Sequence, residues 1–572
     1  MKTKRFLAFL LAAVMCLSLA GCAGQGDPNA NTNNNDTANQ QQEAGEPDAE
    51  QYLNVYLGAE PSTFDISLRT DTYSSTIMLN TMEGLIRTEY HDGEYVATPA
   101  EAETWNISDD QTVWTFHLRD GLKWQDGEPV TAQQYVYSLQ RTADPATGSP
   151  NTIFLQPILN FNEVNTGAMP VDQLGVRAVD EQTLEITLSA PTPAFLSMIS
   201  SSVYYPQRQD VIEANGEKFG SEADAYIGNG PFKVAEWTHN SNIKLEKNEN
   251  YWDADTVKLE TVNIAIITDS STSHNSFLTG ELDIINNVDT QEWKMQFEAD
   301  EANVSAPYTT ATMNFQFYNY KDALFSNVNI RKAFTLCLDL DDLNEMCYGG
   351  LRDPAEGWVV PNMTVGDKNY RDEAGDMIAE MKADLEAEGK TPKDLLLQGM
   401  EELGLGNDPS TLDVTYSLAG TSEWYRTMGE YLQQVYKQEL GVDIEISYAE
   451  WGIFQSNVQS GNYQIGMMSW GAYYNDPYDV LTLYTSGYDA IGTGWANDEF
   501  DQIVAASAHE TDDAQRLQDY IDAETILLKD ECVVCPLATT VYNRFLKSYV
   551  YGYDEEGAFT STGYKYMYTS GR

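Results

Sequence analysis

The sequence predicts an α/β protein built from at least two domains. Strand-like and helix-like segments alternate in its second half, which favours a lobe with a partly parallel sheet. Strand signals dominate the first half instead. About 520 residues follow a polar N-terminal stretch, which is more than a single hydrophobic core usually supports.

The early strands carry alternating patterns that end at turn residues. Residues 112–118 (TVWTFHL) are rich in β-branched and aromatic side chains and stop at an Asp-Gly turn. Thr131 then caps a predicted helix that continues to Arg141. Residues 184–188 (LEITL) alternate cleanly, and a further β-rich stretch covers 232–246. We therefore expect strands with one intervening helix in this region.

Helical patterns alternate with strands in the second half. Residues 376–403 interleave Glu and Lys on what should be a solvated helix face. Residues 421–440 form an amphipathic pattern that ends at Gly441. A strand at 442–448 and a helix at 450–460 follow. This succession is the basis of the α/β prediction.

The N-terminus has the pattern of an export signal. Basic residues within the first five positions precede an apolar run at 6–19, which is too short to span a membrane. The run ends in LAGC, which resembles a bacterial lipobox whose cysteine is Cys22. We predict a lipoprotein signal peptide at 1–21. Lipidated Cys22 would then hold the protein on the outer face of the cell membrane, or in the periplasm if the organism has an outer membrane.

The segment 22–50 is predicted to be a disordered tether that begins at the lipidated cysteine. Residues 23–50 lack Lys, Arg and aromatic residues and are rich in Asn and Gln. Such a composition buries too little apolar surface to offset its chain entropy. A flexible coil of this length reaches roughly 30 Å, enough to lift a folded body off the membrane.

The charge and the motif content exclude several classes of function. The formal net charge is −55 and the pI is near 4.1, which disfavours nucleic acid and anionic lipid as partners. The five histidines are scattered, and no nucleophile elbow or phosphate-binding loop is present. We predict no catalytic residue, no metal site, no cofactor and no nucleic-acid partner.

Two further motifs have structural interpretations. Cys532 and Cys535 form a C-x-x-C pair in an apolar run, but no second pair or neighbouring histidine completes a zinc set. We expect them to pack on opposite faces of a buried strand. Asp339, Asp341 and Asp342 lack the glycine and glutamate of a calcium loop, so they are expected to cap a helix N-terminus.

Aromatic residues are the positive signal, with 35 tyrosines and 11 tryptophans. A β-like run at 463–468 leads into WGAYYNDP at 470–477. A strand that ends in small residues between aromatic rings can offer open backbone groups to an extended ligand. The same rings could equally fill a core, and residue chemistry alone favours neither interpretation.

Several segments decide between these alternatives. They are PAEAETW at 99–105, WTFHLRDGLKW at 114–124, DGEPVTA at 126–132, GNGPF at 228–232, GELDI at 280–284, NIRKAF at 329–334 and the segment 470–477. In content and order they resemble the peptide-type (family 5) extracellular solute-binding proteins of bacterial ABC importers, which include oligopeptide-binding proteins. The resemblance covers essentially all of 51–572.

This resemblance implies the periplasmic-binding-protein-like type II fold (cluster C). Two main α/β lobes would surround a hinged cleft, with an extra small lobe beside them. The expected boundaries are 51–94, 205–313 and 546–572 for lobe I, 95–204 for lobe II and 314–545 for lobe III. The resemblance also implies a monomer without enzymatic activity that delivers peptides to the permease subunits of an importer.

The resemblance further implies the ligand site. An extended peptide is expected to pair through its main chain with Trp470, Gly471 and Ala472, while Asp71 and Thr72 pair with it from the other lobe. The expected ligand-binding residues continue along the chain with Tyr473, Tyr474, Asn475 and Asp476.

Two positions depart from the family pattern. Tyr473 stands where the family motif has an Asp that pairs with the ligand's α-amine, and Met467 stands where an arginine near the ligand carboxylate is often found. These departures leave open peptides without free ends, unusually long peptides, or another solute such as an oligosaccharide or a nickel chelate. Outside the family, a secreted glycan-degrading lipoprotein would share the acidity, aromatics and anchor but would not show the family segments.

The lipobox gives a testable prediction. Cys22→Ser should move the protein from the membrane fraction to the medium, because two acyl chains give the stable attachment that one chain does not. Cys16→Ser, which changes a cysteine inside the apolar run, is the matched control and should stay membrane-bound. Fractionation and immunoblotting measure both variants, and equal membrane retention of the two would contradict the lipobox.

Overall fold

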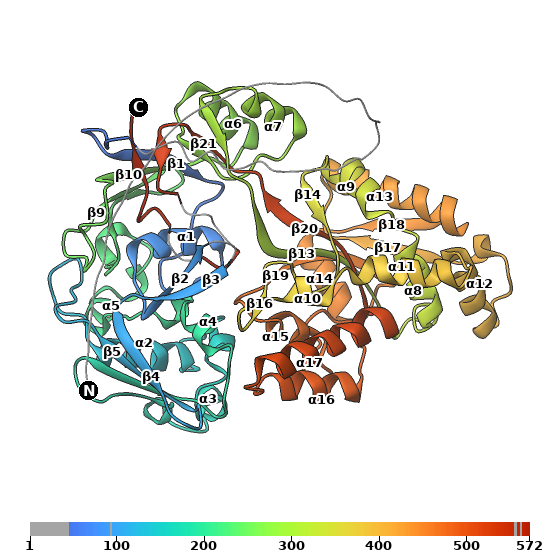
Figure 1. The fold of residues 1–572 in the computed structure, drawn as a ribbon, viewed down its shortest axis with the longest axis horizontal. Coiled ribbons are helices and arrows are strands. Elements are labelled where there is room, and N and C mark those ends of the chain that lie inside the picture. The colour runs from blue at the N-terminus through green and yellow to red at the C-terminus, as the bar shows by residue number, and fades with distance from the viewer. Residues whose placement is uncertain (1–44, 92–93, 554–557, 561–562) are drawn as a thin grey trace, which may run out of the picture. The chain divides into compact units, whose positions relative to one another are not determined.

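Three larger sheets organise the part of the chain that the computed structural model describes, namely residues 45–91, 94–553, 558–560 and 563–572 (Figure 1). Helices and strands alternate through this region, so the α/β prediction is confirmed. Cys22, the predicted signal peptide and most of the predicted tether lie outside the described residues.

The first sheet brings the start of the folded chain beside a segment two hundred residues further on. β1 (Tyr52–Leu57) pairs in parallel with β10 (Thr261–Ile266). β9 (Asn242–Lys247) and β8 (Phe232–Thr238) continue the sheet as an antiparallel hairpin. The predicted β-rich stretch at 232–246 is therefore a two-stranded hairpin.

The two ends of the described chain meet beside this sheet. Asp48 N donates to Thr569 O at 2.9 Å, and Gly571 N donates to the Asp48 carboxylate at 2.8 Å. The short strands β22 (Val550–Tyr551) and β23 (Tyr568–Thr569) pair next to them. The last residues of the predicted tether thus contact the folded body, which begins a few residues before Gln51.

The second sheet has four strands in the order β4-β5-β7-β6. Its strands are β4 (Ala102–Ile107), β5 (Val113–Leu118), β6 (Val176–Ala178) and β7 (Thr183–Thr187). α2 (Ala132–Ala143) is the predicted helix, and the Gln134 side chain accepts from Thr131 N at 2.9 Å to close its N-terminus.

The third sheet has six strands in the order β14-β20-β13-β19-β17-β18. These are β13 (Tyr308–Tyr318), β14 (Arg352–Pro354), β17 (Val414–Leu418), β18 (Ile444–Tyr448), β19 (Ile465–Gly471) and β20 (Val534–Tyr542). β17 pairs in parallel with β18 and β19, whereas β13 pairs antiparallel with β19 and β20 (Figure 1). The expected partly parallel sheet is confirmed.

Helices and smaller strands complete the described residues. The longer helices are α1 (Thr72–Thr81), α6 (Ser270–Thr279), α7 (Gln291–Glu298), α8 (Val328–Leu336), α9 (Leu340–Tyr348), α11 (Met377–Ala387), α12 (Pro392–Glu402), α13 (Glu423–Val435), α14 (Trp451–Gln459), α16 (Asp498–Ser507) and α17 (Asp513–Thr525). The short helices are α3 (Phe161–Asn165), α4 (Phe195–Ile199), α5 (Gln209–Asn215), α10 (Tyr370–Ala374) and α15 (Tyr478–Leu481). The remaining strands are β2 (Ile86–His91), β3 (Glu94–Pro99), β11 (Ile284–Ile285), β12 (Asn303–Ser305), β15 (Thr364–Val365), β16 (Lys368–Asn369) and β21 (Phe545–Lys547).

Two local predictions need correction. The helical pattern at 376–403 is not one helix but the pair α11 and α12, because Gly389 takes a positive φ and Thr391 caps a new helix that begins at Pro392. Cys532 and Cys535 are both buried and reduced, but they do not share a strand. Cys532 has a φ of 47° and precedes β20, which begins at Val534.

The capping prediction for the aspartates is confirmed. Asp339 is the N-cap of α9, and its side chain accepts from the backbone of Asp341 and Asp342. Across the described residues, no helix is both long and apolar enough to cross a membrane.

Most of the buried hydrophobic residues belong to one of two cores. One gathers side chains between Ala311 and Ala538 around the six-stranded sheet. The other combines side chains between Leu53 and Ile284 with a few from the C-terminal segment. Tyr474 packs into this second core although its neighbours along the chain belong to the first. Tyr474 therefore links the region around the six-stranded sheet to the region that contains the second core.

A buried ion pair fixes α17 against the six-stranded region. Glu524 is fully buried and accepts from Trp358 N at 2.6 Å, from the Tyr370 hydroxyl at 2.8 Å and from Arg371 Nη2 at 2.7 Å. Every polar atom of this carboxylate thus has a partner, which is the condition under which a buried charge is tolerated.

Removing this carboxylate should destabilise the protein strongly. Glu524→Ala leaves the Arg371 charge buried without its partner, which should lower the free energy of unfolding by about 3–5 kcal/mol. Urea unfolding followed by circular dichroism measures the loss. The control Glu373→Ala breaks the exposed Lys368–Glu373 pair (3.1 Å) and should change stability little. Equal losses of unfolding free energy in Glu524→Ala and Glu373→Ala would show that the buried Glu524 network stabilises the protein no more than an exposed ion pair does.

Candidate functional site

The end of β19 has one edge that its neighbouring strands do not cover. Its register with β13 continues to the pair Thr312 and Gly471, whereas its register with β17 ends at Leu418 and Met467. Residues 468–471 are therefore paired on the β13 side and lie beyond the reach of β17 on the other. An edge of this kind is a template for pairing with another extended chain.

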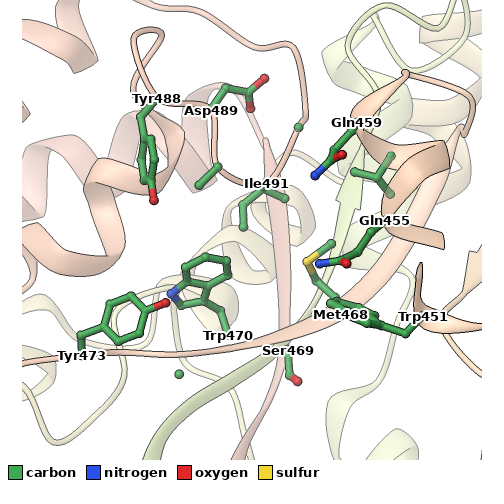
Figure 2. Close-up of a pocket in the computed structure, with 14 residues that line it drawn as sticks. Trp451, Gln455, Gln459, Met468, Ser469, Trp470, Tyr473, Tyr488, Asp489 and Ile491 are labelled. Atoms are coloured by element: carbon green, nitrogen blue, oxygen red, sulfur yellow. The ribbon is translucent and has the colours of Figure 1, made fainter. Parts of the chain in front are cut away.

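A cavity of about 780 Å³ lies along this edge. Met468, Ser469, Trp470 and Gly471 line it from the strand, and Tyr473 lines it from the loop that follows. In Figure 2 the rings of Trp470, Tyr473 and Tyr488 lie on one side, and the amides of Gln455 and Gln459 point into the space from the other. The strand end thus borders a space that is large enough for a ligand.

Helix α14 supplies the wall opposite the aromatic rings. Trp451, Gln455 and Gln459 recur at intervals of four, which places them on one face of the helix. These three residues and Tyr488 are not among the ligand-binding residues that the sequence predicted. The spacing of four, directly before the aromatic strand, is the signal that could have identified the helical ones.

The chemistry of this cavity is aromatic and largely neutral. The Trp470 Nε1 donor is buried without a partner among the described residues. Asp489 also lines the cavity, but its carboxylate already accepts from Thr493 N and Gly494 N, both at 2.9 Å. The cavity can therefore offer ring faces, amides and an indole donor to a ligand.

The loop after β19 is held by hydrogen bonds at every step. Ala472 N donates to Ala311 O at 2.8 Å, and Tyr473 N donates to Asp479 Oδ2 at 2.6 Å. Asn475 contacts Thr364 through both of its side-chain polar atoms, each at 2.8 Å. The loop is therefore a preorganised surface, and the Tyr473 side chain remains 47% exposed on it.

The predicted residues of the two segments border adjacent cavities. Ala472, Tyr473 and Tyr474 line a space of about 280 Å³, and Thr72 lines another of about 550 Å³. These two spaces share the α1 residues Thr76 and Leu79, and Tyr473 is shared with the 780 Å³ cavity. The structure thus brings Thr72 and the 470–474 segment to neighbouring parts of one cleft.

Asp71 does not present a free carboxylate to this cleft. It is the N-cap of α1, and it accepts from Ser74 N at 2.7 Å, from Ser74 Oγ at 2.8 Å and from both polar atoms of Ser62. Burial alone would raise its pKa, but these hydrogen bonds hold the pKa of Asp71 below its usual value. Asp71 therefore fixes the start of α1, beside Thr72.

Asp476 is buried rather than directed at the cleft. It is 2% exposed and accepts from the Tyr520 hydroxyl at 2.7 Å and from Tyr478 N at 3.0 Å. Burial raises the pKa of Asp476, and the nearby Arg516 charge acts in the opposite direction. In this geometry Asp476 and Asn475 hold the loop, whereas Trp470 to Tyr473 border the space.

Within the described residues, no group of three or more His, Cys, Asp or Glu side chains is placed to hold a metal ion.

Comparisons with known proteins agree on the family. The model of the bacterial extracellular solute-binding proteins, family 5 (middle region), matches residues 97–491. The chain is 32% identical over 543 residues to the dipeptide-binding protein DppE of Bacillus subtilis, covering 93% of both proteins. It is 32% identical over 494 residues to the oligopeptide-binding protein OppA of the same organism, covering 85% of this chain and 87% of that one. The solved structure of Haemophilus influenzae OppA in complex with RPPGFSPFR superimposes with a TM-score of 0.73 at 26% identity, covering 92% of this chain and 100% of that one.

The fold thus defines a protein of the periplasmic-binding-protein-like type II class. The chain belongs to family 5 of the bacterial extracellular solute-binding proteins. The fold and the family that the sequence segments implied are both confirmed.

The loop geometry predicts the effect of removing Asn475. Asn475→Ala deletes both side-chain bonds to Thr364, which should lower the free energy of unfolding by about 1–3 kcal/mol. It should also increase hydrogen exchange at 471–477 and around Thr364. Asn462→Ala, at an exposed position one loop earlier, is the control and should change neither quantity. An unchanged exchange rate at 471–477 in Asn475→Ala would contradict the proposed loop anchor.

Proposed function

We propose that this protein captures extended peptides along the open edge of β19 and delivers them to an ATP-driven importer. The observation that carries the proposal is the register of β19. Its pairing with β17 ends at Met467, so residues 468–471 have one unpaired edge, and this edge borders the 780 Å³ cavity. A peptide main chain can pair with this edge whatever its side chains are, since every peptide presents the same amide ladder.

The relatives support a peptide as the ligand. DppE and OppA of Bacillus subtilis are named as dipeptide- and oligopeptide-binding proteins, and the Haemophilus influenzae OppA structure contains a peptide. In the proposed complex, Trp470, Gly471 and Ala472 supply backbone groups and the segment at Thr72 faces them. Tyr473 and Tyr474 supply ring faces, while Asn475 and Asp476 keep the loop in place.

We propose that lobe closure buries the ligand, with lobe boundaries as given above. Besides the packing of Tyr474 into the second core, two hydrogen bonds and one ring contact join the segment 154–197 to the 473–509 region. Asn475 N donates to Ser197 Oγ at 2.8 Å, His509 Nδ1 lies 2.8 Å from Pro191 O, and the rings of Phe154 and Tyr473 are 5.6 Å apart. Such a small set can separate and re-form, and a ligand that contacts both sides would favour the closed arrangement.

The rest of the proposed function follows from the N-terminus and the family. A lipid on Cys22 would keep this monomeric binding protein near the permease subunits of its importer. An oligosaccharide is the second candidate ligand, because Trp451, Trp470 and the two glutamines place ring faces and amides around one cavity.

Identification of the ligand and of closure tests the proposal. Protein purified without denaturation should release peptides on denaturation, detected by mass spectrometry. Adding the recovered peptide should shrink the radius of gyration in solution scattering and change tryptophan fluorescence.

Two matched variants locate the fluorescence signal. Trp470→Phe should remove most of the fluorescence change, because Trp470 borders the site. Trp105→Phe, in β4, should keep it. Release of glycans instead of peptides would favour the second candidate, and tight binding without any change in radius would count against closure.

A further inference from the structure

A second cavity, of about 430 Å³, lies beyond the Tyr473–Tyr474 loop. One wall comes from residues 153–198, including Ile153, Thr192 and Ala194. The other comes from residues 474–520, including Tyr474 and Asp479. None of the β19 edge residues lines it, so it is distinct from the space in Figure 2.

This cavity adjoins the proposed peptide cleft at two points. Tyr488 lines both the 430 Å³ cavity and the 780 Å³ cavity, and Tyr474 lines both the 430 Å³ and the 280 Å³ spaces. The contacts between Ser197 and Asn475 and between Pro191 and His509 flank it. An occupant would therefore touch both walls and could belong to a ligand that lies along β19.

The buried carboxylate of Asp479 faces this cavity. Asp479 is 3% exposed, and Oδ2 accepts from Tyr473 N at 2.6 Å. Among the ion pairs of the described residues, none contains Asp479. Burial raises the pKa of Asp479 to about 7, and the neighbouring Asp476 charge adds to the effect. A carboxylate in this state gains most from a cationic partner.

The surroundings of Asp479 favour a cation. The rings of Tyr474, Tyr478, Tyr488 and Tyr520 line the cavity, and aromatic faces attract cations. The charged groups nearby are three carboxylates, Asp476, Asp479 and Asp513, against the single guanidinium of Arg516. The exposed imidazole of His509 lies at the rim.

Arg516 does not reverse this balance. Its Nη2 pairs with Asp513 at 2.9 Å, and its charge stabilises the ionised form of Asp476. Its Nε and Nη1 atoms are buried from solvent, and neither has a hydrogen-bond partner within the described part of the chain. An anion in the cavity would meet the Asp479 carboxylate as well as the guanidinium, whose charge the neighbouring Asp476 and Asp513 offset, so the balance opposes an anionic ligand.

We propose that this cavity binds a cationic group of the peptide, either its α-ammonium or a lysine or arginine side chain, with Asp479 as the counterion. The inference rests on the proposed peptide-binding function. Because the cavity has one wall on each side of the closure contacts, a bound cation would also link occupancy to closure.

The cation and the proton compete for Asp479. Binding a cation favours the ionised carboxylate, so binding near neutral pH should release a proton, and affinity for cationic peptides should rise as the pH increases through about 7. Calorimetry in two buffers of different ionisation enthalpy measures the proton release. Asp479→Asn should abolish this release, whereas His509→Gln should retain it.

Peptide libraries test the specificity directly. Two random pentapeptide libraries, one with free amines and one N-acetylated, are incubated with each variant, and the retained peptides are sequenced by mass spectrometry. The wild-type protein should retain peptides that carry the recognised cation, either a free α-ammonium or a Lys or Arg side chain, at least about tenfold better than acetylated peptides without Lys or Arg, and Asp479→Asn should reduce this preference to below about threefold.

Two further variants control for indirect effects. Ala194→Leu fills the cavity from the opposite wall and should also weaken the preference without altering Asp479. Asp512→Asn removes a nearby charge but keeps a good N-cap for α17, so it should behave like the wild type. Enrichment of Lys and Arg in both libraries identifies the side chain as the source, whereas weaker capture of the acetylated library without Lys or Arg enrichment in either library identifies the α-ammonium.

The outcomes separate this inference from the proposed function. Peptide capture without a cation preference, or a preference that survives in Asp479→Asn, overturns the inference alone. Enrichment of acidic peptides that disappears in Arg516→Gln would replace it with an anion site. Capture of no peptide from either library by any variant would overturn the proposed function, and this inference with it.

Discussion

The pairing of β19 is the constraint on which the ligand site depends. β13 pairs with this strand along its full length, whereas β17 leaves it at Met467. If β17 continued, residues 468–471 would be an interior strand without groups to offer. If β13 were absent, the same residues would have no support. A half-covered strand end, backed by a buried sheet, is both rigid and available, which is what main-chain recognition requires.

Much of the fold could be predicted from local patterns because local chemistry determines it. Thr131 and Gln134 close the start of α2, Asp339 caps α9, and alternation marks β5 and β7. The errors fall where a single backbone geometry overrides composition. Gly389 and Thr391 split a continuous charged pattern into α11 and α12, and the positive φ of Cys532 delays the start of β20.

The sequence could predict the part of the candidate site that lies in one continuous segment, but not the residues that the fold brings to it from elsewhere in the chain. The sequence identified the aromatic segment at Trp470, and the spacing of four on α14 could have indicated the helical wall. Tyr488 reaches the cavity only through tertiary packing, which no local pattern reports. The carboxylates show the same limit. Asp476 lies within the motif and is buried against Tyr520, whereas Asp479, three residues later, faces a cavity. A separation of three residues therefore places Asp479, but not Asp476, at a cavity wall.

The two kinds of recognition in this cleft have different physical costs. Main-chain pairing at β19 replaces solvent hydrogen bonds with similar ones, so it contributes modestly and tolerates many sequences. A cation that pairs with Asp479 loses its strong hydration and gains a buried charge partner. The pair therefore adds little to the binding free energy unless the two groups are well aligned and fully shielded from water. The proposed closure would complete this alignment and shielding, because the wall at 153–198 lines the same cavity as Asp479 in the arrangement in which Asn475 N donates to Ser197 Oγ. Under the proposed closure, main-chain pairing at β19 and cation selectivity at Asp479 depend on the same lobe movement, and a ligand that pairs only with the strand would favour that movement less.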